Sequence, residues 1–139
     1  MSLYVLDSDT LSLYSHRHAA VTQNMLAHTP AELATTVINV EEMLTGWHSL
    51  LRAVKTRTDL AQVYDRLAKT VPLLAEFSIL SFTEPAILRF EQLHATKLNV
   101  RKMDLRIAAI ALEHSATLVT RNTRDFQRVP GLTLEDWTV

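Results

Sequence analysis

Residues 104–126 read DLRIAAIALEHSATLVTRNTRDF, and this stretch indicates how the chain folds. The apolar residues of its first part recur at helical spacing, so we expect a helix over residues 104–114. The short apolar run 117–120 then predicts a buried strand. Asn122 and Asp125 in the polar segment behind it are typical of a turn. A helix followed at once by a buried strand favours an α/β fold.

The rest of the chain alternates in the same way. We expect further strands at residues 2–6, 33–38, 77–80 and 132–135. We expect helices at residues 8–14, 19–27, 40–54, 57–74 and from Pro85 to about residue 97, with Asn39 capping the third of them. The third and fourth helices predict a helical hairpin. Together these elements predict a three-layer α/β/α domain with a central, mainly parallel sheet.

Length and composition limit the class of protein. The 139 residues predict one domain over residues 1–139, with no linker or repeat. The lack of cysteine excludes disulfides, thiolate zinc sites and a cysteine nucleophile, and it fits a reducing cytoplasm. No apolar run approaches the ~18 residues of a membrane span, and no secretory signal is visible. We therefore expect a cytoplasmic protein that does not bind membranes.

Acidic and amide side chains stand where helices begin or strands end. Asp7 follows the first expected strand, Glu42 follows residues 36–38, and Asp104 opens a helix. Asn122 follows the strand at 117–120, with Asp125 close behind. The carboxyl ends of parallel strands meet at one edge of a sheet, so these side chains should converge there. Clustered oxygen ligands of this kind suit Mg²⁺ or Mn²⁺.

The net charge of −1 does not indicate a strongly basic nucleic-acid-binding surface. The basic residues are local instead, beside two of the candidate site positions. They are Arg101, Lys102 and Arg106 around Asp104, and Arg121, Arg124 and Arg128 around Asn122. These two groups are either solvated loop charge or phosphate-binding cations at the rim of an acidic pocket.

Two other families of α/β protein have a functional aspartate at the end of a strand. The residue positions of this chain fit neither of them. Haloacid-dehalogenase phosphatases have Asp-x-Asp-x-Thr after the first strand, but here Thr10 comes one residue early and Leu11 takes its place. Receiver domains need an aspartate at the end of a middle strand, where this chain has Ile38-Asn39.

Four segments, in order, resemble the motifs of the PIN-domain nucleases, and more narrowly of the VapC-type toxins of prokaryotic toxin–antitoxin pairs. They are Leu6-Asp7-Ser8-Asp9, residues 36–46 (TVINVEEMLTG), residues 104–111 (DLRIAAIA) and residues 118–126 (LVTRNTRDF). In the second segment the acidic residue of the family stands four before a glycine. This register selects Glu42 over Glu41, because the glycine here is Gly46.

The resemblance implies a PIN-like fold and a Mg²⁺- or Mn²⁺-dependent endoribonuclease. The implied catalytic residues are Asp7, Glu42, Asp104 and Asn122, and the implied metal ligands are the same four with Asp125. Arg106, Arg121 and Arg124 are the candidates for holding RNA phosphates. The implied partners are an RNA substrate, a second copy of the chain in a homodimer, and a cognate VapB-type antitoxin whose C-terminal segment fills the groove.

The chain departs from the family at one site position. Many relatives have aspartate where Asn122 stands, and Asp9 or Asp125 would have to supply the missing charge. A neutral fourth ligand leaves an alternative function open, a catalytically weak PIN-fold module that binds RNA or protein. A small phosphatase is a third and weaker hypothesis.

Overall fold

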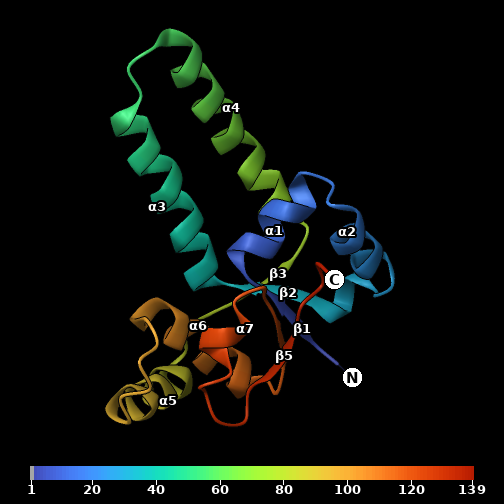
Figure 1. The fold of residues 1–139 in the computed structure, drawn as a ribbon, viewed down its shortest axis with the longest axis vertical. Coiled ribbons are helices and arrows are strands. Elements are labelled where there is room, and N and C mark those ends of the chain that lie inside the picture. Colours follow the sequence, from blue (N-terminus) through green and yellow to red (C-terminus); the bar gives the residue numbers. More distant parts are fainter. Residues whose placement is uncertain (1) are drawn as a thin grey trace.

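One parallel sheet of five short strands lies at the centre of the fold, in the order β3-β2-β1-β4-β5 (Figure 1). The computed structural model describes residues 2–139. The strands are β1 (Tyr4–Leu6), β2 (Leu33–Thr36), β3 (Ser78–Leu80), β4 (Thr117–Val119) and β5 (Thr133–Glu135). The chain runs outward from β1 to β3 on one side and then returns to add β4 and β5 on the other. Between β1 and β4 the strand order therefore reverses, which is where open α/β sheets bind ligands.

Helices cover both faces of this sheet, which confirms the expected three-layer arrangement (Figure 1). The helices are α1 (Ser8–Ser15), α2 (Ala19–Leu26), α3 (Val37–Ala53), α4 (Arg57–Leu74), α5 (Glu84–Ala95), α6 (Lys102–Glu113) and α7 (Thr123–Phe126), with a short 3₁₀ turn at Pro30–Glu32. No helix among the described residues is both long and apolar enough to cross a bilayer.

Alternating strand residues separate two apolar cores. Val5 and Leu118 face one core, which α5, α6 and α7 complete. Leu6 and Val119, their neighbours in sequence, face the other core with α1 and α2. Successive side chains of a strand point to opposite faces of the sheet, and both faces here are buried. The central strands β1 and β4 therefore carry successive buried apolar residues, as in other parallel sheets.

The predicted helical hairpin is present and extends away from the sheet (Figure 1, green). Its helices, α3 and α4, are joined by a hydrogen bond that Trp47 Nε1 donates to Thr70 Oγ1 over 2.8 Å. The base of α3 lies beside the carboxyl edge of the sheet, because β2 leads directly into it.

The boundary between β2 and α3 was wrong in the sequence-based prediction. The strand ends at Thr36 rather than at residue 38, and Thr36, not Asn39, is the N-cap of α3. The two side chains form a reciprocal capping box, in which Asn39 N donates to Thr36 Oγ1 and Thr36 N donates to Asn39 Oδ1. This box starts the helix early enough to include the β-branched residues Val37 and Ile38. Similarly, α6 begins at Lys102, two residues before Asp104.

Candidate functional site

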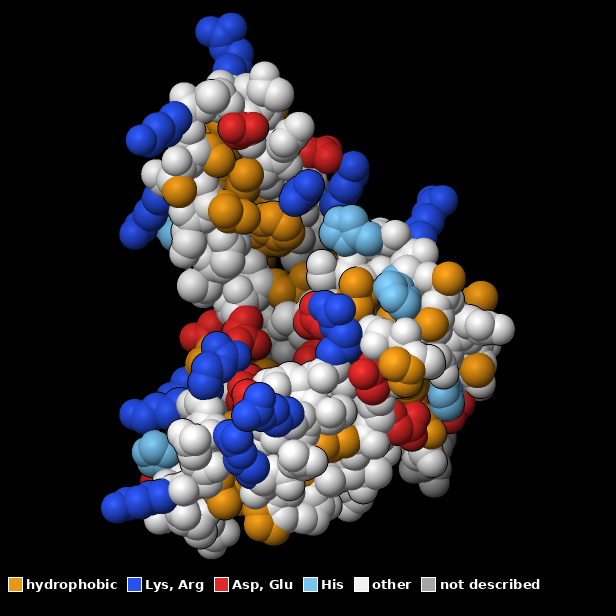
Figure 2. All heavy atoms as spheres, in the orientation of Figure 1, with side chains coloured by type: hydrophobic (Ala, Val, Ile, Leu, Met, Phe, Trp, Pro, Cys, Tyr) orange, Lys and Arg blue, Asp and Glu red, His pale blue; other side chains and the backbone are white. Residues whose placement is uncertain are grey.

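A cavity of about 280 Å³ lies at the carboxyl edge of the sheet, where β1 and β4 are neighbours. Figure 2 shows acidic side chains gathered in a hollow below the hairpin, with Lys and Arg side chains around it. The polar residues that line the cavity include the four predicted catalytic positions together with Asp9 and Arg101. Those four positions are Asp7, Glu42, Asp104 and Asn122, which the fold brings together from four separate segments.

The edge of the sheet beneath the cavity is fixed by buried threonine hydroxyls. Thr35 Oγ1 donates to the carbonyl of Leu6 over 2.8 Å, and Thr10 Oγ1 donates to the carbonyl of Val119 over 3.3 Å. These bonds engage the last carbonyls of β1 and β4, and the Val119 carbonyl also accepts from the Asp7 backbone N–H over 3.2 Å. The backbone just before Asp7 is therefore held from β2 on one side and tied to β4 on the other.

Asp7 follows β1 directly and is the N-cap of α1. Its Oδ1 accepts a hydrogen bond of 2.8 Å from the Thr10 backbone N–H. Burial raises the pKa of the Asp7 carboxyl above its ordinary value, although hydrogen bonds from Thr120 and Thr10 act in the opposite direction. A buried carboxylate without a counter-ion is costly, so this group favours a proton or a cation.

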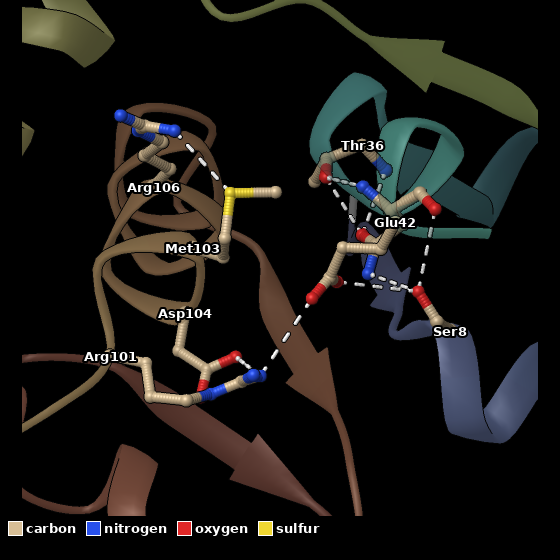
Figure 3. A network of polar contacts seen from close by, with 8 residues as sticks. Ser8, Thr36, Glu42, Arg101, Met103, Asp104 and Arg106 are labelled. Atoms are coloured by element: carbon tan, nitrogen blue, oxygen red, sulfur yellow. Dashed lines mark hydrogen bonds and ion pairs between the residues drawn. The ribbon is translucent and has the colours of Figure 1, made fainter. Parts of the chain in front are cut away.

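Glu42 stands in the second turn of α3 and enters the cavity, whereas its neighbour Glu41 is exposed and does not line it. The structure thus places in the cavity the glutamate that the sequence register selected. Burial raises the pKa of Glu42, and the charge of Asp104 raises it further. The Ser8 hydroxyl lies 3.5 Å from Glu42 Oε1 (Figure 3).

Asp104 is buried in the first turn of α6, with a side chain only 6% exposed. Both its oxygens are engaged by Arg101, the N-cap residue of the same helix (Figure 3). Arg101 Nε lies 3.2 Å from Asp104 Oδ2, and Arg101 Nη2 lies 3.0 Å from Oδ1. The same Nη2 lies 3.7 Å from Glu42 Oε2, so one guanidinium spans carboxylates of α3 and α6.

Asn122 lines the cavity, and its side chain makes no capping hydrogen bond to α7, the helix that it precedes. Its backbone N–H donates to Thr120 Oγ1 over 2.9 Å. Of the two acids that were considered to replace its missing charge, Asp9 lines the cavity and Asp125 does not. Asp125 instead pairs with Arg128, 3.3 Å away.

The three arginines predicted to hold phosphates lie in different places. Arg121 is at the rim, where Asp9 accepts hydrogen bonds of 2.6 and 2.8 Å from its guanidinium. Arg124 is exposed and does not line the cavity. Arg106 is half-buried, with its guanidinium carbon 5.3 Å from the centre of the Phe90 ring. The structure therefore does not bring Arg106 into the cavity.

Sequence reasoning missed two polar residues of the site, Ser8 and Asn39. Asn39 is fully buried, and its Nδ2 donates to the Ser8 hydroxyl over 3.1 Å. The spacing Thr36-x-x-Asn39 is a capping-box signal that was available in the sequence. The contact with Ser8, which is 31 residues away, could be found only from the fold.

The donor chemistry of the cavity fits a divalent cation that prefers oxygen ligands. Asp7 and Asp104 are buried carboxylates, and the charges of both raise the pKa of Glu42. Mutual repulsion of this kind is relieved by a cation bound between the groups. In the described residues, no three His, Asp or Glu side chains are already close enough together to hold an ion. The guanidinium of Arg101 stands between two of the candidate ligands.

Comparison with known proteins agrees with this fold. The PIN domain family model matches residues 4–132. Ribonuclease VapC2 of Rickettsia felis is 53% identical over 34 residues, which are 24% of this chain and 25% of that protein. The match thus spans only about a quarter of the curated relative.

Solved structures extend the similarity of fold to the whole chain. A chain of the DNA-bound VapBC of Salmonella typhimurium has a TM-score of 0.79 at 21% identity, over 99% of both chains. A chain of VapBC2 from Rickettsia felis, bound to a DNA fragment from its promoter, has a TM-score of 0.75 at 22% identity, over 97% of this chain and 98% of that one. With the family model matching nearly its full length, the chain belongs to the PIN domain family.

Proposed function

We propose that this PIN domain is a divalent-metal-dependent endoribonuclease and the toxin of a VapBC-type toxin–antitoxin pair. One observation carries the proposal: Asp7, Glu42 and Asp104 reach a single cavity at the reversal of strand order. Local similarity to a protein named ribonuclease supports the reaction class. The similarity of fold to chains of VapBC complexes supports the toxin assignment.

In this proposal each lining residue has a defined task. Asp7 and Asp104 would hold Mg²⁺ or Mn²⁺ in the cavity, and Glu42 would add a third carboxylate, directly or through water. Asn122 orients a ligand through its side-chain carbonyl, which carries no charge. When bound, such an ion supplies an activated water and offsets charge on the attacked phosphate.

The substrate-binding part of the proposal rests on the rim of the cavity. Arg121 is exposed there and Asp9 fixes its orientation, so its remaining N–H donors would bind an RNA phosphate. Arg124 is exposed nearby in the chain and has the same task. Arg106 is left out, because its guanidinium packs on Phe90.

We also infer a VapB-type antitoxin and a homodimer as partners. The helical hairpin carries exposed apolar side chains, namely Leu44, Leu50, Leu60, Tyr64 and Val71. A cleft of about 760 Å³ lies between the hairpin and α1. Exposed apolar side chains that gather on one element favour a protein-binding surface. Light scattering gives the mass of the chain alone, which tests the homodimer. The mass of the chain co-purified with a candidate antitoxin tests the second partner.

The decisive experiment follows cleavage of an end-labelled RNA by the purified chain. We expect cleavage with Mg²⁺ or Mn²⁺, none with EDTA, and none for Asp7→Asn. Glu41→Gln is the matched control and should cleave like the unmodified protein, because Glu41 lies outside the cavity. Cleavage that persists in EDTA or in Asp7→Asn would contradict a metal-dependent reaction at this site.

One observation favours the second candidate, a binding module with weak catalysis. Asn122 brings an uncharged side chain to the cavity, so the site holds one carboxylate fewer than in many members of the family. Retention of labelled RNA in a gel-shift experiment, without cleavage in either metal, would identify this function.

A further inference from the structure

Arg101 is the only positively charged residue among the described residues that line the acidic cavity. It belongs to the same chain as the carboxylates that it contacts, at the first position before α6. Its guanidinium bonds to both oxygens of Asp104 and also lies near Glu42 (Figure 3). Its single positive charge therefore offsets part of the negative charge of the two acids that lie on α6 and α3.

The position of this guanidinium conflicts with a cation bound by the same acids. Arg101 Nε and Nη2 lie 3.2 and 3.0 Å from the two Asp104 oxygens, which leaves neither oxygen free of the arginine. A bound divalent ion would also be repelled by the arginine charge at short range. The guanidinium therefore opposes metal binding through Asp104 for as long as it stays in this position.

Arg101 can move because most of its side chain is in solvent. The side chain is 71% exposed, whereas that of Asp104 is 6% exposed. The arginine therefore loses few packing contacts when it swings outward, and its charge becomes fully hydrated. Asp104 stays in place, since it lies within the first turn of α6. The mobile partner of the pair is the arginine.

We propose that Arg101 is a built-in counter-ion that takes the place of the divalent cation in the metal-free site and competes with its binding. This inference rests on the proposed metal-dependent function. It makes Arg101 a positioning residue that sets the concentration of metal at which the site fills. It also gives Asp104 and Glu42 a stabilising charge before the ion arrives.

Calorimetric titration of Mn²⁺ tests the competition directly. Arg101→Ala and Arg101→Gln should each bind Mn²⁺ at least about fivefold more tightly than the unmodified protein, because about fivefold is the upper end for a fully exposed ion pair and here the carboxylate is buried. Arg101→Lys keeps the charge but loses the bidentate contact with Asp104. Its affinity for Mn²⁺ should therefore lie between that of the unmodified protein and that of Arg101→Ala. Lys102→Ala is the matched control, because it removes an equal charge one residue away, outside the cavity.

Thermal melting supplies a second readout. In EDTA, Arg101→Ala should melt below the unmodified protein, because its carboxylates repel each other without a counter-ion. The rise on adding Mn²⁺ should be larger than in the unmodified protein, because a ligand that binds only the native state stabilises it more when it binds more tightly. Lys102→Ala should show the rise of the unmodified protein.

The outcomes separate this inference from the proposed function. Equal or weaker Mn²⁺ binding by both Arg101→Ala and Arg101→Gln would overturn the competition and leave the metal site standing. A tightening by Lys102→Ala of the same size would show a general effect of charge and would also overturn it. No Mn²⁺ binding by any protein of the series would overturn the proposed metal-dependent function, and the inference with it.

Discussion

The buried amide of Asn39 donates a hydrogen bond of 3.1 Å to the hydroxyl of Ser8, and so links the first turn of α3 to the start of α1. Asn39 Oδ1 accepts from the hydroxyl of Thr36 over 2.7 Å, and the Ser8 hydroxyl lies 3.5 Å from Glu42 Oε1. The connections that follow β1 and β2 are therefore tied together below the cavity. The Glu42 side chain is therefore positioned by α3, which follows β2, and by its contact with Ser8, which follows β1.

The first prediction concerns this link. Asn39→Ala removes a buried side chain and leaves the Thr36 N–H and hydroxyl without their partner. We expect a loss of about 2 kcal/mol in the free energy of unfolding, measured with urea. Gln62→Ala, an exposed change on α4, is the control and should alter stability by less than about 0.5 kcal/mol. Equal effects of the two changes would show that the link adds no stability.

The second prediction concerns stability and pH in EDTA. Because the folded protein raises the pKa of Asp7, this group contributes most to stability in its protonated form, below its ordinary pKa. That contribution is lost as the pH rises through the raised, folded-state pKa. Asp7→Asn removes the titration and keeps the N-cap, since asparagine caps helices as well as aspartate. The variant should therefore be more stable than the unmodified protein at neutral pH.

The gain from Asp7→Asn should shrink as the pH falls towards the ordinary range of aspartate, because the unmodified protein is then protonated at Asp7. Urea unfolding at several pH values measures this difference. A gain that is constant with pH, or a loss at neutral pH, would show that the hydrogen bonds to Asp7 outweigh its burial.

The third prediction concerns the metal ligands. Asp7→Asn and Asp104→Asn should each weaken Mn²⁺ binding by at least about tenfold, because each removes a charged oxygen ligand from a small cavity. Isothermal titration calorimetry measures the affinities. Asp125→Asn is the matched control, since Asp125 pairs with Arg128 outside the cavity. Unchanged affinity in both Asp7→Asn and Asp104→Asn would remove these residues from the site.

The sequence was sufficient for the fold class and for the convergence of the acidic residues. Asp7, Glu42, Asp104 and Asn122 could be found because each stands at a fixed place relative to a strand end or a helix start, and motif register separated Glu42 from Glu41. These are local properties, and parallel topology then brings the positions to one edge.

The roles of the arginines could not be found in this way. Arg101 and Arg106 both flank Asp104 in sequence, yet one enters the cavity and the other packs on Phe90 of α5. The difference depends on which neighbouring helix each side chain meets. The predicted end of β2 was wrong for a similar reason. The β-branched residues Val37 and Ile38 favour a strand, but the capping box of Thr36 and Asn39 places them in a helix.

The fourth prediction uses two adjacent glutamates. Adjacent residues of a helix point about 100° apart, so only one of Glu41 and Glu42 can face the cavity. Growth arrest on expression should disappear with Glu42→Gln and persist with Glu41→Gln. Immunoblotting for equal protein levels is the control. The reverse pattern would show that Glu41 reaches the reacting groups in the active protein.

The fifth prediction concerns Asn122, the uncharged residue at the cavity. Asn122→Asp adds a carboxylate near Asp7 and Asp104, so the metal-free protein should lose stability through repulsion. A loss of about 1 kcal/mol would lower the Tm of a domain of this size by roughly 3–5 °C. With Mg²⁺ the added charge should instead tighten binding, and the rise in Tm should exceed that of the unmodified protein.

Melting curves of Asn122→Asp and the unmodified protein, each in EDTA and in Mg²⁺, measure both effects. The position tolerates the change, because aspartate and asparagine are equally good before a helix and the Asn122 side chain makes no capping bond to α7. Asp9→Asn is the informative comparison, since it removes the other carboxylate at the rim and releases Arg121. If Mg²⁺ raises the Tm of Asn122→Asp no more than that of the unmodified protein, residue 122 does not contact the ion. A smaller rise in Asp9→Asn would then identify Asp9 as the fourth ligand.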